Sequence, residues 1–429
     1  MHTHLAPEFQ DTPQGQAAQD VLLKCVHCGF CTATCPTYQV LGDELDGPRG
    51  RIYLIKQVLE GAEPTRKTQQ HLDRCLTCRN CETTCPSGVE YGHLLDIGRT
   101  IVEDKVQRPM GERLKRWTLK TGLTSPLFAP AMKLGQMVRT YLPENLKAKV
   151  PKAQDSGLWP TTEHSRKVLM LAGCVQPAML PNINFATARV LDAVGVQTVV
   201  AQEAGCCGAL KFHLNDAQAA LDQMRRNIDA WWPWVEPADG AVGVECIVMN
   251  ASGCGVMVKD YGHLLKDDPL YADRAERISA LTQDLSEYLI TLLPELTGLL
   301  QKIQVQAEAH TQGHNSAPPQ RVAYHPPCTL QHGQQVRGAV EQLLKAFGAD
   351  VHLSRTESHL CCGSAGTYSV LQPVMALTLR DRKLEQLSSL QPEVMVSANI
   401  GCITHLQSGT KLPVKHWVEL VDERLRAHH

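Results

Sequence analysis

The chain has 429 residues, a formal net charge of −2 at pH 7, and 43% hydrophobic against 20% charged residues. This length suffices for two or three domains, and the balanced charge lacks the basic excess typical of nucleic-acid-binding domains. No segment reaches the run of about 18 apolar residues that a transmembrane helix needs. The polar N-terminus has no apolar core, so we expect no secretory signal. Seventeen cysteines stand out, because clustered cysteines in a reducing compartment are usually metal ligands or catalytic thiols.

Two runs of four cysteines dominate the N-terminal part of the sequence. They consist of Cys25, Cys28, Cys31 and Cys35, and of Cys75, Cys78, Cys81 and Cys85. Both read C-x2-C-x2-C-x3-C-P, the spacing with which ferredoxins bind cubane clusters. Zinc is the alternative, but four-cysteine zinc sites usually combine two C-x2-C pairs across a longer spacer. The compact runs therefore favour two [4Fe–4S] clusters.

The segments around the second run have helical apolar patterns. Residues 49–60 place apolar side chains on one stripe, and residues 91–102 show the same pattern. With the cysteine runs, they resemble the α-helical ferredoxin domain of iron–sulfur subunits in succinate dehydrogenase-like and glycerol-3-phosphate dehydrogenase-like complexes. The resemblance implies crossed ligation, in which the last cysteine of each run binds the other cluster. The first cluster would then be bound by Cys25, Cys28, Cys31 and Cys85, and the second by Cys75, Cys78, Cys81 and Cys35.

Positive side chains accompany these motifs, and a basic segment follows them. Arg49, Arg51, Lys56 and Arg99 either offset the negative charge of the clusters or are ordinary solvated helix charges. Residues 101–153 contain eleven Lys and Arg against four Asp and Glu. We interpret 105–165 as a basic helical connector and linker. It either packs on its own domain or contacts an anionic membrane surface or an acidic partner.

The remaining sequence contains an internal repeat. Each copy starts with a buried strand that ends in a cysteine, continues through a helix, a glycine and a second strand, and then reaches Cys-Cys-Gly. Each copy closes with an apolar run and a glycine-flanked cysteine. The first copy contributes Cys174, Cys206, Cys207 and Cys254, and the second contributes Cys328, Cys361, Cys362 and Cys402. The alternation of strands and helices predicts two α/β domains.

The repeat resembles the pair of cysteine-rich CCG domains of heterodisulfide reductase, lactate-utilisation, anaerobic glycerol-3-phosphate dehydrogenase and glycolate oxidase iron–sulfur subunits. Where that motif has its last cysteine, this chain has Met257 and His405. The five-cysteine site of heterodisulfide reductase is therefore incomplete in both copies. Three alternatives stay open for the eight cysteines: an additional cluster or metal, a redox or docking surface, or a metal-free remnant. Cys246 matches nothing in the second copy and is expected to be a buried core thiol.

The complete pattern predicts an α+β multidomain protein. We expect an α-helical two-cluster ferredoxin domain at 1–104, the connector at 105–165, a first CCG domain at 166–300, a linker at 301–320 and a second CCG domain at 321–429. The chain lacks a dinucleotide fingerprint, a P-loop and the hydrolase and metalloprotease motifs. No catalytic residue is expected on it, and the substrate-oxidising centre should lie on another subunit.

A ferredoxin domain followed by two CCG domains in one chain resembles the glycolate oxidase (glycolate dehydrogenase) iron–sulfur subunit family. The stretches CVHCGFCTATCPTY and CLTCRNCETTCPSGVEYG carry this resemblance. It implies FAD-containing partner subunits that oxidise glycolate to glyoxylate, with D-lactate as a further substrate, and electron transfer toward membrane quinone. It also implies a cytoplasmic location, peripheral on the inner membrane. The alternatives are a subunit for lactate or glycerol-3-phosphate oxidation, a non-redox docking scaffold for flavoproteins, and a thiol–disulfide enzyme that uses vicinal cysteines.

Overall fold

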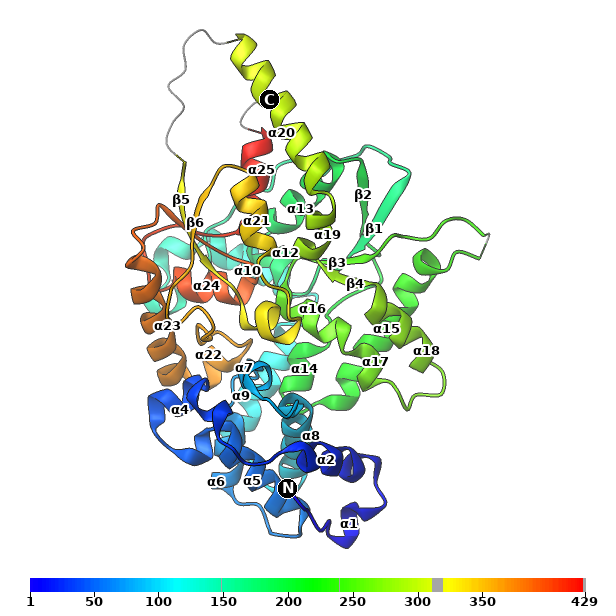
Figure 1. Cartoon of the computed structure of the whole chain (residues 1–429), viewed down its shortest axis with the longest axis vertical. Helices are drawn as coiled ribbons and strands as arrows, with labels where there is room; N and C mark the ends of the chain where they lie inside the picture. The colour runs from blue at the N-terminus through cyan, green and yellow to red at the C-terminus, as the bar shows by residue number, and fades with distance from the viewer. Residues whose placement is uncertain (148, 239, 311–318, 427–429) are drawn as a thin grey trace.

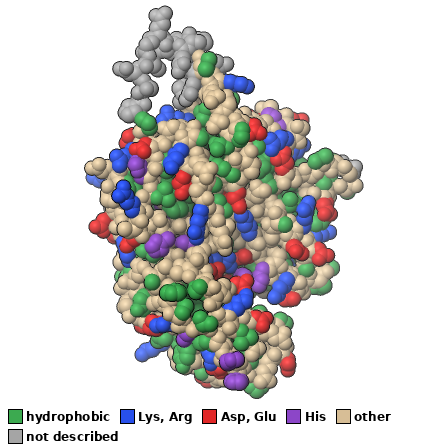
Figure 2. Space-filling view, in the orientation of Figure 1, with side chains coloured by type: hydrophobic (Ala, Val, Ile, Leu, Met, Phe, Trp, Pro, Cys, Tyr) green, Lys and Arg blue, Asp and Glu red, His purple; other side chains and the backbone are tan. Residues whose placement is uncertain are grey.

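The computed structural model describes residues 1–147, 149–238, 240–310 and 319–426. Helices form the N-terminal part at one end of the molecule, and two α/β repeats lie side by side above it (Figure 1). This is the α+β multidomain architecture predicted from the sequence. None of the described helices is long and apolar enough to cross a membrane. Lys, Arg, Asp and Glu are interspersed over the face seen in Figure 2, in line with the balanced net charge.

The N-terminal domain consists of short helices that pack around α5 and α8. The hydroxyl of Thr12 accepts a hydrogen bond from the Gly15 amide, and proline occupies the first turn of both α2 and α5, as is typical of helix starts. Gly98 lets α8 lie directly on Ile55 of α5. The elements are α1 (Pro7–Gln10), α2 (Pro13–Lys24), α3 (Phe30–Ala33), α4 (Pro36–Leu41), η1 (Glu44–Asp46), α5 (Pro48–Leu59), α6 (Arg66–Asp73), α7 (Asn80–Thr84) and α8 (Tyr91–Lys105).

The basic connector is helical at first and is attached to the first repeat. It comprises α9 (Met110–Gly122), α10 (Phe128–Met137), η2 (Arg139–Tyr141) and α11 (Glu144–Lys147). Helix α10 packs on α12 of the first repeat, and Lys120 forms an ion pair with Asp216 at 2.7 Å. Residues 151–164 contain no helix or strand.

The first repeat is a four-stranded parallel sheet in the order β2-β1-β3-β4. Its elements are β1 (Arg166–Met170), α12 (Gln176–Met179), α13 (Asn182–Asp192), β2 (Val196–Val199), α14 (Ala209–His213), α15 (Ala217–Val235), β3 (Ile247–Met249), α16 (Ser252–Lys259), α17 (Tyr261–Leu264), α18 (Ala272–Leu281), β4 (Thr282–Asp284), α19 (Leu285–Thr291) and α20 (Leu293–His310). Residues 301–310, expected to belong to a linker, are therefore helical. Residues 311–318 lie outside the described part.

The second repeat has the same topology, with parallel strands in the order β6-β5-β7-β8. Its elements are β5 (Arg321–His325), η3 (Thr329–Gly333), α21 (Ala339–Ala346), β6 (Asp350–His352), α22 (Tyr368–Leu371), α23 (Pro373–Ser388), β7 (Val394–Ser397), α24 (Ile400–Gln407), β8 (Val414–His416) and α25 (Trp417–Arg426). The opening strands do not end in Cys174 and Cys328, as expected, but stop before them at Met170 and His325. In the second repeat, Pro326 and Pro327 supply no amide hydrogen to continue the ladder.

The two repeats pack around an approximate twofold relation. Helix α13 of the first repeat contacts α25 of the second, and α21 of the second contacts α19 of the first in the equivalent way. Arg189 forms an ion pair with the buried Asp422 at 2.7 Å across this interface. A single hydrophobic core includes both Val168 and Val322 from the two opening strands. The repeats therefore form one structural unit.

Candidate iron–sulfur and metal sites

The two ferredoxin loops share one backbone conformation. His27 and Gly29 have positive φ angles of 60° and 87°, and Thr77 and Arg79, at the equivalent positions of the second loop, have φ angles of 51° and 56°. Left-handed residues between right-handed ones turn successive amide groups toward a common centre, which forms an anion-binding concavity. Both loops are therefore shaped to surround an anionic cluster.

The first cavity is lined by three cysteines of the first run and by the last cysteine of the second. These residues are Cys25, Cys28, Cys31 and Cys85, with Cys81 at the edge shared with the second cavity. Cys28 is exposed, whereas Cys25 is buried. The pKa of the Cys31 thiol is raised to about 11, mainly by burial and in smaller part by the nearby Cys25 and Cys85. Because iron binds the thiolate form, a bound cluster would relieve this electrostatic cost.

The second cavity has the complementary composition. It is lined by Cys35, Cys75, Cys78 and Cys81. The Thr77 amide and the Tyr91 hydroxyl donate hydrogen bonds to Cys75 Sγ at 3.4 and 3.6 Å. Each cavity thus collects three cysteines from one run and the fourth from the other, the arrangement that crossed ligation requires. Tyr91 was not singled out from the sequence, because only the fold brings its hydroxyl to a cysteine of the preceding loop.

Buried arginines supply positive charge next to the second cavity. Arg51 lines it, is 1% exposed, and forms an ion pair with the buried Asp46 at 3.4 Å. Arg99 Nη2 donates to the Cys75 carbonyl at 2.8 Å. Lys56 pairs with Glu60 instead. Guanidinium groups that are buried beside four thiols fit a site that holds net negative charge.

In the first repeat, four thiols form a hydrogen-bonded chain. Its members are Cys174, from the loop after β1, Cys206 and Cys207, from the C-C-G loop, and Cys254, from α16, joined in that order. Hydrogen bonds from the Cys174 and Cys207 thiols and from two backbone amides lower the pKa of Cys206. The fold thus gathers the first set of repeat cysteines around one thiol that favours the thiolate form.

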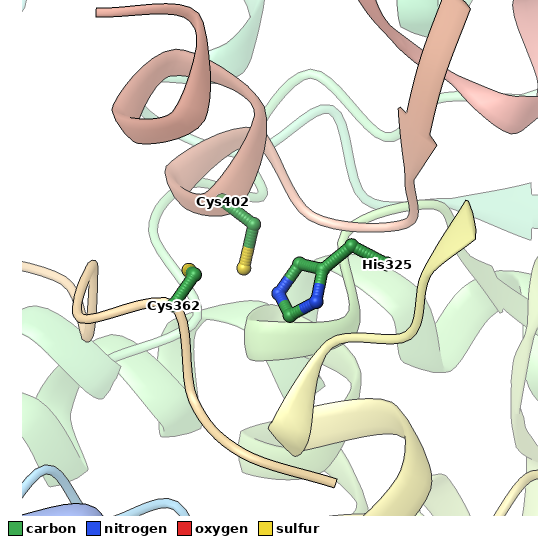
Figure 3. Close-up of side chains that lie close together, drawn as sticks. All are labelled: His325, Cys362 and Cys402. Carbon is green, nitrogen blue, oxygen red and sulfur yellow. The ribbon is translucent and has the colours of Figure 1, made fainter. Parts of the chain in front are cut away.

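In the second repeat, the equivalent thiols gather with a histidine among them. Cys328 Sγ and Cys361 Sγ lie 3.8 Å apart, and Cys362 hydrogen-bonds with both Cys361 and Cys402. His325, from the end of β5, points its ring toward Cys362 and Cys402 (Figure 3). His325 was not predicted as a ligand from the sequence, although it stands three residues before Cys328. The first repeat has Leu171 three residues before Cys174.

The two residues that replace the last family cysteine do not join these thiols. Met257 is buried in the core of the first repeat. His405 Nε2 donates to the Ala376 carbonyl at 3.0 Å. Cys246, expected as a core thiol, is 1% exposed in the shared core, which confirms that prediction.

The second ferredoxin cavity lies against the second repeat. Cys78 packs with Cys328 and Cys361 in one small apolar cluster, and Cys328 contributes to the raised pKa of Cys78 after burial itself. Thr83 Oγ1 and His332 Nδ1, 2.9 Å apart, form a further link between the domains. No spacing rule predicts this contact, because the two motifs belong to separate folding units.

Comparisons with known proteins agree with this geometry. The 4Fe-4S dicluster domain matches residues 21–89, and the cysteine-rich domain matches residues 168–259 and 322–407. The chain is 51% identical to the glycolate oxidase iron–sulfur subunit of Escherichia coli (strain K12), over 99% of each chain. It is 31% identical to the probable glycolate oxidase iron–sulfur subunit of Bacillus subtilis (strain 168), over 90% of this chain and 89% of the relative. The chain belongs to the glycolate oxidase iron–sulfur subunit family. It is an iron–sulfur protein, and the predicted resemblance is confirmed.

A more distant relative covers less of the chain. Lactate utilization protein A of Exiguobacterium sp. (strain ATCC BAA-1283 / AT1b) is 24% identical over 60% of this chain and 98% of its own length. It therefore matches only part of the multidomain arrangement, whereas the two glycolate oxidase subunits match nearly all of it.

Proposed function

We propose that this chain is the iron–sulfur electron-transfer subunit of a flavin-dependent 2-hydroxy acid dehydrogenase complex that oxidises glycolate to glyoxylate. The observation that carries this proposal is the pair of adjacent cysteine-lined cavities in a chain 51% identical to a glycolate oxidase iron–sulfur subunit. Two [4Fe–4S] clusters would be bound by Cys25, Cys28, Cys31 and Cys85, and by Cys75, Cys78, Cys81 and Cys35. Such clusters carry single electrons away from a two-electron flavin centre.

An apolar rim around the first cavity suits a protein partner. Val26 and Phe30 line the cavity and are 69% and 62% exposed, and Leu23 and Tyr53 are also exposed. Exposed apolar and aromatic side chains around a redox site are typical of docking surfaces. We infer that an FAD-containing subunit docks here, next to the exposed Cys28.

Contact with a membrane is proposed for the basic connector. Its helices α9 and α10 expose Met110, Leu114, Trp117, Leu134 and Met137, and Leu127 is exposed directly before α10. A helical surface that combines exposed apolar and basic residues suits the boundary of an anionic membrane. We propose a cytoplasmic protein, peripheral on the inner membrane, that passes electrons toward quinone.

Lactate is the second candidate substrate. The match with lactate utilization protein A favours it, because nearly the whole of that relative matches 60% of this chain. D-lactate and glycolate are both 2-hydroxy acids, so one flavoprotein partner could oxidise either. Glycerol-3-phosphate and a non-redox docking scaffold remain the alternatives against which the proposal is tested.

The test uses the complex purified anaerobically with its flavoprotein subunits. Glycolate should reduce the ferredoxin clusters, as seen by low-temperature EPR, whereas glycerol-3-phosphate should not; D-lactate measures the second candidate. Cys28→Ser should lose the first cluster's signal and substrate-driven quinone reduction. Cys246→Ala, in a core thiol outside the motifs, is the matched control and should keep both. Undiminished quinone reduction in Cys28→Ser after loss of the signal would favour the docking scaffold.

A further inference from the structure

A pocket of about 500 Å³ opens at the carboxyl ends of β1 and β2 in the first repeat. It is lined by Met170 at the end of β1, by Thr198 of β2 with Val200 just after that strand, and by Phe185 of α13. Parallel α/β sheets bind ligands outside the carboxyl ends of their strands, and ligand pockets have volumes of about 300–1,000 Å³. The position and the size of this pocket are therefore those of a small-molecule site.

The lining of the pocket is neutral and largely apolar. None of the described residues that line it is charged. Trp159 and Phe185 both line it, and their rings meet edge to face, with centroids 5.2 Å apart and planes at 88°. A charged ligand, such as a dinucleotide or a 2-hydroxy acid anion, would lose its hydration here without gaining a counter-charge. The two aromatic side chains instead favour a flat, uncharged ring.

The hydroxyl of Thr198 provides an unused hydrogen-bonding group at this pocket. Its Oγ1 atom is buried and has no hydrogen-bond partner in the described part of the chain. The amide of Asn184, which also lines the pocket, already donates to the Ala172 carbonyl at 3.0 Å. A buried polar group without a partner is costly. A ligand with a carbonyl oxygen would accept a hydrogen bond from Thr198 and remove that cost.

The indole of Trp159 is held in place by contacts outside the pocket. Trp159 belongs to residues 151–164, which contain no helix or strand. Arg189 Nη1 donates to the carbonyls of Ser156 and Leu158 at 2.7 and 3.3 Å, and so fixes the backbone directly before Trp159. A wall that is ordered before binding lowers the entropic cost of taking up a ligand.

The second repeat shows that the fold itself does not require a neutral pocket. Tyr324 and Met170 occupy equivalent positions, four residues before the first cysteine of each repeat, and each lines a pocket of its own repeat. The pocket of the second repeat has a volume of about 470 Å³, is bounded in part by the ferredoxin domain, and is lined by Arg337 and Glu341. The neutral lining is therefore a property of the first repeat, and it selects the ligand.

We propose that the pocket at the carboxyl ends of β1 and β2 binds the ring of a lipid-soluble quinone. The ring would pack against Trp159 and Phe185, and one ring carbonyl would accept a hydrogen bond from Thr198. Helix α10 contacts α12, whose Pro177 lines the pocket. The pocket thus adjoins the connector surface for which membrane contact is proposed, where the apolar tail of a quinone would lie. This inference deepens the proposed function, because it rests on quinone as the electron acceptor.

Photolabelling tests binding directly on the wild-type full chain purified anaerobically. The protein is irradiated with an azido derivative of decylubiquinone, and the labelled peptides are identified by mass spectrometry. We expect label on the peptides that contain Trp159 or Phe185, and excess decylubiquinone should abolish it. Label in the pocket of the second repeat, label that excess decylubiquinone does not displace, or no label at all would overturn the proposal. This measurement needs neither a variant nor glycolate.

Kinetics of the complex purified with its flavoprotein subunits test the individual side chains. Trp159→Ala should raise the KM for decylubiquinone about three- to tenfold, because an aromatic wall is lost. Thr198→Val keeps the side-chain shape and should raise this KM about two- to tenfold, because the hydroxyl is lost. Leu158→Ala is the matched control and should keep the KM, since Leu158 is 87% exposed and does not line the pocket. Unchanged KM values in both pocket variants would overturn the proposal.

A separate readout distinguishes failure of the proposal from failure of the proposed function. Reduction of the ferredoxin clusters by glycolate is followed by EPR in the same wild-type complex, without quinone. If glycolate does not reduce the clusters, the proposed function fails, whereas competed photolabelling would still support the quinone site. If glycolate reduces the clusters but the pocket takes no label, the proposed function stands and the quinone site is overturned.

Discussion

The Tyr91 hydroxyl is expected to set part of the reduction potential of the second ferredoxin cluster. It donates to Cys75 Sγ at 3.6 Å and is fully enclosed, with Tyr91 only 4% exposed. Hydrogen bonds to cluster sulfurs raise the potential because they stabilise the reduced, more negative state. Tyr91→Phe removes this donor and keeps the ring that packs between the two cavities. We therefore expect the potential to fall.

The size of the shift follows from the strength of the bond. Hydrogen bonds to charged groups contribute about 1.5–3 kcal/mol, and this one, long and made to sulfur, belongs at the low end. Only the difference in hydrogen-bond strength between the oxidised and reduced states changes the reduction potential. We take this difference to be about 0.5–1 kcal/mol. At 59 mV per tenfold change for one electron, this corresponds to a decrease of about 20–40 mV.

EPR-monitored redox titration of the purified protein measures both clusters in one sample. Tyr53→Phe is the matched control, because this half-exposed ring lies beside His27 of the first loop, 6.4 Å between centroids. It should leave the second cluster's potential unchanged. An unchanged or increased potential in Tyr91→Phe, or a shift confined to the first cluster, would refute the assignment of this bond to the second site.

Three further predictions concern stability and are measured by thermal or guanidinium unfolding. Gly98→Ala should destabilise the chain by about 1–3 kcal/mol, because the added Cβ would lie 2.6 Å from the Ile55 side chain. Gly111→Ala is the control and should not destabilise the chain, because a Cβ there would meet no other atom. Equal destabilisation by both substitutions would contradict this packing argument. Asp46→Asn should lower the free energy of unfolding by about 3–5 kcal/mol, because the Asp46 carboxylate is fully buried between two arginines. A decrease below about 1 kcal/mol, as for an exposed ion pair, would contradict this prediction. Burial lowers the pKa of His332 to about 4 from 6.5. The unfolded chain thus binds more protons between these values, and stability falls as pH falls from about 6.5 to about 4. His332→Gln should flatten that fall, and an unchanged pH profile would contradict the role of this histidine.

Local spacing explains why the ferredoxin part was readable from the sequence. The first three cysteines of each run are two residues apart, so the chain itself brings these three thiols together, whereas the fourth cysteine of each cavity comes from the other run. The α/β repeats could also be predicted from local sequence, because a strand, a helix, a helix-ending glycine and a second strand follow one another in each copy. Residues 301–310, within the linker expected at 301–320, are helical because they continue α20. This stretch is rich in Gln, Ala and Glu, which favour helices.

The features that the sequence did not reveal depend on packing between separate units. Cys78 meets Cys328 only because the ferredoxin domain docks on the second repeat. Tyr91 reaches Cys75 only because α8 folds back on the second loop. His325 differs, since a comparison of the two strand ends, Leu171 against His325, carries the signal in the sequence itself. Such residues are found by comparing the repeats with each other rather than with a motif.

The duplication has produced two similar folds with different environments for the same cysteines. In the first repeat, hydrogen bonds from neighbouring thiols and amides lower the pKa of Cys206, and the groups that most strongly shift the pKa values of Cys174, Cys206 and Cys207 are other residues of the same repeat. In the second repeat, Cys328 and Cys361 pack with Cys78 of the ferredoxin domain in one apolar cluster. Short distances favour electron transfer, so the second thiol set is well placed to exchange electrons with a cluster in the second ferredoxin cavity if it holds a redox centre. The two sets also differ in their neighbours, since the first repeat has Leu171 three residues before Cys174, whereas the second has His325 three residues before Cys328.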